Sequence, residues 1–118
     1  MPDDRPVLVV ISADPRSSHR ANEAMRIGLG IVSGENDVIF VLRGPGVYLL
    51  NDDTDDLVDG DDIARFRDSL RSLGVPFHLE DGARPSDPGW NAAGHRVVSV
   101  SAAGIVDLAR GSRRVLIF

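Results

Sequence analysis

In this 118-residue chain, polar residues directly follow four apolar runs, and such residues could bind a ligand or a substrate. Carboxylates, hydroxyls and a guanidinium supply acids, bases, hydrogen-bond donors and anion ligands. We predict a ligand-binding site from the following six residues: Ser12, Asp14, Arg43, Gly46, Glu80 and Asp81. Ser99 and Ser101 stand at the end of the fourth run and are weaker candidates.

Glu80 is the residue on which we expect the site to depend, because it directly follows an apolar run. We expect Ser12, Asp14, Gly46 and Glu80 to line one small polar pocket. As an alternative, Glu80, Asp81 or Asp14 serves as the acid or base of a small enzyme, with or without a metal. No catalytic residue is assigned, because no serine, histidine and acid are arranged for nucleophilic catalysis and no GxSxG motif is present.

Neither a cofactor nor a metal is predicted. Arg43-Gly44-Pro45-Gly46 lacks the spacing and the lysine of a phosphate-binding loop and reads as a plain turn. The acidic run 52–62 does not have the spacing of an EF-hand and reads as a solvated loop. His78 and Glu80, with His95 or Asp81, are a second metal hypothesis, against which we favour an edge-strand histidine with ordinary hydrogen bonds.

Composition excludes several classes of function. The chain has no cysteine, so it carries no disulfide, no thiolate metal site and no catalytic thiol. The net charge of −5 argues against nucleic-acid binding and against binding to anionic membranes. The start of the chain is polar and acidic, unlike a signal peptide, and no apolar run is long enough to span a membrane. We expect a cytoplasmic protein.

The elements that position these residues follow from the hydrophobic pattern. Continuous β-branched runs predict strands that are buried on both faces, and apolar spacings of three and four residues predict helices. Ser17 or Ser18 is expected to cap the first helix, and Leu73 to lie on the apolar face of the second. Strands are expected at about 7–11, 38–42, 75–79, 96–100 and 115–118, and helices at about 18–33, 62–73 and 102–110.

Strands that alternate with helices predict a three-layer α/β/α sandwich with a five-stranded, mainly parallel sheet and one domain over 1–118. In such a sheet the six candidate residues follow the carboxyl ends of strands, the edge where ligands bind. One apolar run, 47–50, lies outside these elements. It either packs onto the edge of the sheet or forms an exposed patch, which monomers seldom tolerate.

Several segments resemble the DsrE-like family, which comprises DsrE, DsrF, DsrH and their Tus relatives. They are the strand 7–11 with the helix 21–31, the strand 38–42 ending in Gly44-Pro45-Gly46-Val47, Leu73-Gly74-Val75 before Glu80, and the terminal helix and strand 104–118. The resemblance implies strand order 4-3-2-1-5 and a homo-oligomer, a trimer or a hexamer.

Family members pass sulfur as a cysteine persulfide, and the reactive position corresponds here to Glu80 or Asp81. A carboxylate cannot carry that sulfur. The resemblance therefore implies an oligomeric subunit that binds a small ligand or a partner without sulfur transfer.

Overall fold

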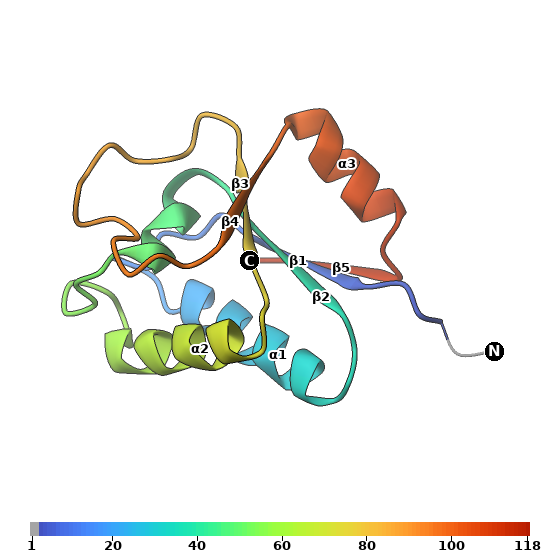
Figure 1. The fold of residues 1–118 in the computed structure, drawn as a ribbon, viewed down its shortest axis with the longest axis horizontal. Helices are drawn as coiled ribbons and strands as arrows, with labels where there is room; N and C mark the ends of the chain where they lie inside the picture. Colours follow the sequence, from blue (N-terminus) through green and yellow to red (C-terminus); the bar gives the residue numbers. More distant parts are fainter. Residues whose placement is uncertain (1–2) are drawn as a thin grey trace.

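The apolar runs form five strands in a computed structural model that describes residues 3–118 (Figure 1). The elements are β1 (Val7–Ile11), α1 (Arg20–Ser33), β2 (Val38–Leu42), the 3₁₀ helix η1 (Gly44–Leu50), α2 (Gly60–Ser72), β3 (Phe77–Glu80), β4 (Val97–Val100), α3 (Ala102–Arg110) and β5 (Arg114–Ile117).

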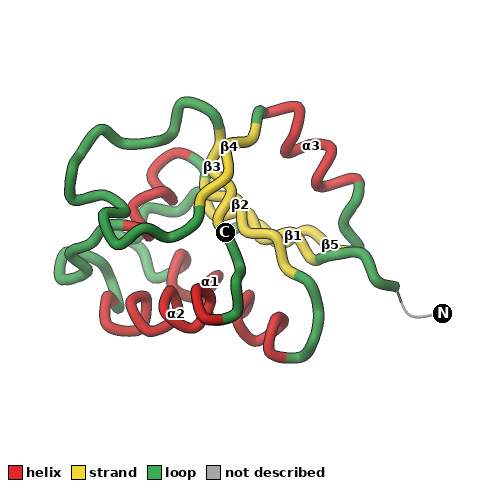
Figure 2. Tube along the Cα trace, viewed as in Figure 1, coloured by secondary structure: helices red, strands yellow, loops and turns green. Residues whose placement is uncertain are grey.

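The strands form one sheet in the order β4-β3-β2-β1-β5 (Figure 2). All four pairings are parallel. The predicted fold class and strand order are therefore confirmed. All five residues of β1 are buried, as expected of a strand with neighbours on both sides and helices on both faces.

Alternation along β1 divides the core between the two faces of the sheet. Val9 and Ile11 belong to the larger cluster, with residues of α1, α2 and η1. Leu8 and Val10 belong to a smaller cluster, against which residues of α3 pack. Figure 1 shows α1 and α2 together on one side of the sheet and α3 alone on the other. We call the latter side the α3 face.

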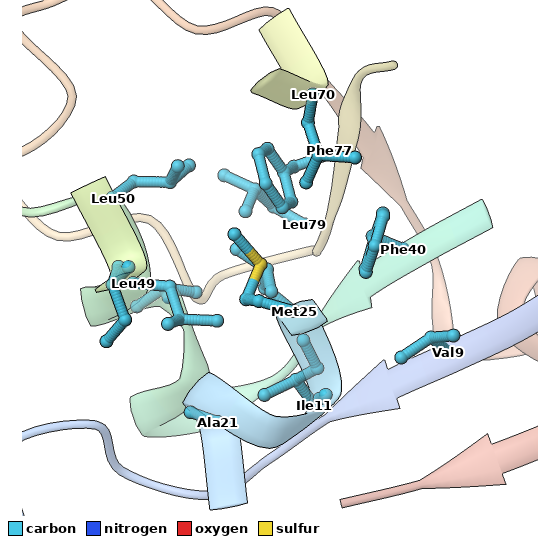
Figure 3. Close-up of a cluster of buried hydrophobic side chains, with 14 of the residues drawn as sticks. Val9, Ile11, Ala21, Met25, Phe40, Leu49, Leu50, Leu70, Phe77 and Leu79 are labelled. Carbon is cyan, nitrogen blue, oxygen red and sulfur yellow. The ribbon is translucent and has the colours of Figure 1, made fainter. Parts of the chain in front are cut away.

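Two phenylalanines, Phe40 and Phe77, belong to the larger cluster (Figure 3). The rings of Phe40 and Phe77 lie with centroids 5.5 Å apart, and Met25 of α1 is fully buried among the same residues. Helix α1 approaches this layer closely at Gly28, where an added Cβ would stand 2.2 Å from Cζ of Phe40. Close packing on the sheet thus explains this glycine. Nothing in the structure explains Gly30, around which no atom lies within 4 Å of the position of a Cβ.

The apolar run 47–50 forms most of η1 and is largely buried. Leu49 and Leu50 are at most 1% exposed, so this run offers no patch for association. The loop between β3 and β4 covers it: the indole Nε1 of Trp90 donates to the carbonyl of Val47 at 2.7 Å. The first of the two expectations, a segment packed onto the sheet, is correct.

Element ends differ from the predicted ones by a few residues. Helix α1 begins at Arg20, and its N-cap is His19, without a capping side-chain bond. Ser18 precedes this N-cap, and its Oγ accepts from the N–H of Arg20 at 3.2 Å. Neither Ser17 nor Ser18 is therefore the N-cap residue. Leu73 is 54% exposed, because α2 has already ended and Leu73 is its C-cap. Helix α3 has the predicted bounds, with Ser101 Oγ accepting from the N–H of Gly104 at 2.9 Å.

Within the described residues, no helix combines the length and the apolar character that crossing a membrane requires.

Candidate functional site

A groove of about 200 Å³ opens on the α3 face, at the carboxyl edge of the sheet. Its lining residues are Arg43, Glu80, Ala102, Ile105 and Val106. The first two follow or end β2 and β3, and the other three belong to the first half of α3. The groove is thus built where the fold rule for parallel sheets places ligands.

The register of the sheet brings the two charged residues together. Leu42 and Leu79 are paired across β2 and β3, so the next residues, Arg43 and Glu80, stand side by side. Nε of Arg43 donates to Oε2 of Glu80 at 2.8 Å. The side chains are 47% and 26% exposed, so the pair contributes at most about 1 kcal/mol to stability. The hydrogen bond holds the guanidinium at the groove.

Ion pairing leaves much of the guanidinium available. Of the guanidinium nitrogens of Arg43, only Nε donates a hydrogen bond within residues 3–118, and the two terminal nitrogens have no acceptor there. A planar guanidinium with free donors binds carboxylates and other oxyanions in a forked geometry. Ile105 and Val106 supply apolar surface beside it. The groove therefore suits a small anion that carries an apolar group.

The other predicted site residues do not line this groove. Ser12 is exposed, and its N–H donates to the carbonyl of Phe118. Gly46 is buried so closely that an added Cβ would stand 2.2 Å from the carbonyl oxygen of Ile11. Asp81 is exposed, with its N–H bonded to Val100. Of the four residues expected to line one pocket, only Glu80 lines the groove. The binding roles of the other residues stay predictions.

Asp14 forms a separate cluster in the loop between β1 and α1. Its carboxylate accepts from Nε of Arg16 at 3.0 Å and from Nη2 at 2.9 Å. The guanidinium of Arg16 lies 3.9 Å from the ring centroid of Tyr48. The side-chain bond from Arg16 lowers the pKa of Asp14 below its ordinary value. A carboxylate held ionised in this way is poorly matched to proton transfer near neutral pH.

The metal hypotheses find no support in the geometry. Phe77 and Leu79 of β3 belong to the larger cluster, so His78 and Glu80 face the α3 side, whereas His95 packs edge-on against Phe77 on the opposite side. The acidic run 52–62 borders an open hollow of about 420 Å³. Among residues 3–118, no three histidine or carboxylate side chains gather as metal ligands.

His78 also differs from the expected edge-strand histidine. Strand β3 lies between β2 and β4, inside the sheet. The buried Nδ1 of His78 has no hydrogen-bond partner within the described residues.

The apolar residues of the groove were not predicted from the sequence. Ala102, Ile105 and Val106 read as an ordinary helix face, although the helix predicted at about 102–110 directly follows the fourth strand and so begins at the carboxyl edge. Only the packing of α3 across the sheet shows which residues of that helix lie beside Arg43.

We expect the protein to lose stability as the pH falls below about 6.5. Burial lowers the pKa of His78 and His95, and the nearby cations Arg67 and Arg71 lower that of His95 further. Between the folded pKa and the ordinary value, the unfolded chain binds more protons than the folded one. The stabilisation is therefore complete above about pH 6.5 and is lost as the pH falls through the folded pKa.

Urea unfolding at about pH 7.5 and about pH 5.5 measures this loss. The double variant His78→Asn with His95→Asn should lose less stability between the two pH values than the unmodified protein. An equal loss in both proteins would show that other groups dominate.

The comparisons with known proteins place the fold. No protein-family model matches the chain, and no curated protein sequence matches it. A solved structure, the crystal structure of the ychN protein from E. coli, is similar with a TM-score of 0.75 over 97% of this chain and 99% of that chain. The two sequences are 16% identical. The chain has this DsrE-like α/β fold, and a likeness at that identity carries the fold alone.

Proposed function

We propose that this protein is a DsrE-like subunit that binds a small organic anion and does not transfer sulfur. The observation that carries the proposal is the Arg43–Glu80 pair beside Ile105 and Val106 in the groove. The guanidinium is held by one nitrogen and offers the others to a ligand oxyanion. The apolar side of the groove receives the carbon chain of the same ligand.

The proposal that the protein does not transfer sulfur rests on the chemistry of its side chains. The resemblance to the family puts the reactive position at Glu80 or Asp81, and the chain contains no thiol. Persulfide transfer needs a thiolate that attacks and then carries the outer sulfur. Incubation with a persulfide donor, followed by intact-mass measurement, should find no sulfur added to the protein.

Titration with hexanoate tests the ligand class. Two-dimensional amide NMR should show shifts confined to the ends of β2 and β3 and to the first half of α3. Hexylammonium, with the same chain and the opposite charge, should bind about tenfold more weakly or not at all. Acetate should also bind more weakly, because it lacks the apolar chain.

Matched variants locate the binding. Arg43→Gln should weaken hexanoate binding by about tenfold, since it removes the charged fork. Glu80→Gln should retain the binding, because the amide oxygen can still accept from Nε of Arg43 while the competing negative charge is removed. Arg110→Gln, an exposed arginine elsewhere on α3, serves as the control and should leave the affinity unchanged. Equal affinity in the Arg43 and Arg110 variants would exclude the groove as the anion site.

We further propose that the subunit works as a homo-oligomer, as the resemblance implies, in a trimeric or hexameric assembly. The exposed large apolar side chains of the described chain support this. Four of the five lie on or beside the α3 face: Val98, Val106, Val115 and Ile117. Light scattering should give a mass well above the 12.7 kDa of one chain.

A further inference from the structure

Of the two open edges of the sheet, the β5 edge carries the more exposed large apolar side chains. β5 lies at the end of the strand order and pairs only with β1. Ile117 is 69% exposed, the highest value among the large apolar side chains described, and Val115 is 38% exposed. The strand contains no proline, and its one charge is Arg114 at its start. Edges without such protection pair readily with another strand.

The backbone of β5 shows which residues offer hydrogen bonds to a partner. The N–H of Phe118 donates to Val10, and its carbonyl accepts from the N–H of Ser12, so both groups point toward β1. Backbone groups alternate in direction along a strand. The N–H and carbonyl groups of Val115 and Ile117 therefore point away from β1, to the open edge.

The same two residues carry the exposed apolar side chains. Val115 pairs with Leu8, and Ile117 with Val10, both of the smaller cluster, so all four side chains lie on the α3 face. Val115 and Ile117 thus each offer both outward-pointing backbone groups and an exposed apolar side chain. An antiparallel strand that repeats this spacing fits both.

We propose that a second copy of this chain pairs antiparallel along β5, about a two-fold axis at Leu116, and joins two sheets into one. Val115 then stands opposite Ile117 of the partner subunit, and the two exchange both backbone hydrogen bonds. Two such pairs form, one on each side of the axis. This contact adds an interface to the proposed homo-oligomer and rests on that proposal, since a hexamer built from two trimers related by two-fold axes contains two-fold contacts.

Other registers fit less well. A shift by one residue sets outward-pointing groups against inward-pointing ones and forms no ladder. A two-fold axis at Val115 sets Leu116 and Ile117 against Arg114 and Arg113 of the partner subunit, a poor match of apolar and charged side chains. The axis at Leu116 instead leaves the two Arg114 side chains four residues apart along the ladder. Of the registers compared, only the axis at Leu116 sets the two exposed apolar side chains, Val115 and Ile117, opposite each other.

Cysteine cross-linking tests the register, and the absence of native cysteine makes each introduced thiol the only one in the chain. Leu116 would face its own copy as a pair without backbone hydrogen bonds, with Cα atoms about 4.5 Å apart, within disulfide range. Leu116→Cys should form a disulfide-linked dimer under mild oxidation. The control Ser99→Cys, on the opposite edge strand β4, should remain largely monomeric on a non-reducing gel.

Light scattering on Ile117→Lys separates this contact from oligomerisation itself. The charge should raise the concentration needed for half-association by about tenfold or more. An unmodified protein that stays at 12.7 kDa would overturn the proposed oligomer. An oligomer whose mass is unaffected by Ile117→Lys and in which Leu116→Cys does not cross-link would overturn the β5 contact alone. Circular dichroism of each variant confirms that it is folded.

Discussion

Gly28→Ala is expected to destabilise the protein by about 1–3 kcal/mol, although alanine is the better helix former. The added Cβ would stand 2.2 Å from Cζ and 2.5 Å from Cε1 of Phe40. Phe40 is fully buried against Phe77 and cannot swing away without disturbing that contact. Urea unfolding measures the change, with an unaltered slope as evidence that both states keep their compactness.

Gly30→Ala is the matched control, two residues along the same helix. No atom lies within 4 Å of the Cβ position there, so this variant should be more stable by up to about 1 kcal/mol. Combining Gly28→Ala with Phe40→Leu should cost less than the sum of the two single changes, because the smaller side chain makes room for the methyl group. Strict additivity, or a Gly28→Ala variant as stable as Gly30→Ala, would contradict the close approach of α1 to β2.

Arg67→Met is expected to destabilise the protein by about 2–4 kcal/mol. Arg67 is 7% exposed, and its Nη1 donates to the carbonyls of Leu49 at 2.9 Å and Asn51 at 2.6 Å. Burial lowers the pKa of this guanidinium, which nevertheless stays charged at neutral pH. Methionine fills a similar volume but leaves both carbonyls without that donor. Relief of the buried charge offsets part of the loss.

The control is Arg65→Met on the same helix, an exposed arginine that pairs with Asp62. It should change stability by no more than about 0.5 kcal/mol. Amide exchange adds a local measurement: Arg67→Met should speed exchange in η1 more than in β1 and β2. If both variants have the stability of the unmodified protein, Arg67 does not hold η1 to α2.

The hydrophobic pattern was sufficient to predict the five strands, the three α-helices and the class of fold. β1 and β2 are continuous apolar runs, as is typical of strands whose sheet is covered by helices on both faces. Such runs can be recognised in the sequence alone. The cap at Ser101 and the terminating Gly111 give α3 its predicted bounds. Strand order came from the resemblance to a family, since pattern alone does not rank neighbours in a sheet.

The sequence by itself determined the class of fold, the edge on which polar residues gather and the absence of thiol chemistry, because these depend on residue type and local periodicity. Tertiary structure alone decided that Arg43 and Glu80 meet, since the register of β2 and β3 sets their distance. It also decided that the run 47–50 is covered, by Trp90 from a loop more than forty residues away. Contacts of that kind join segments distant in sequence, and no local pattern records which of them pack together.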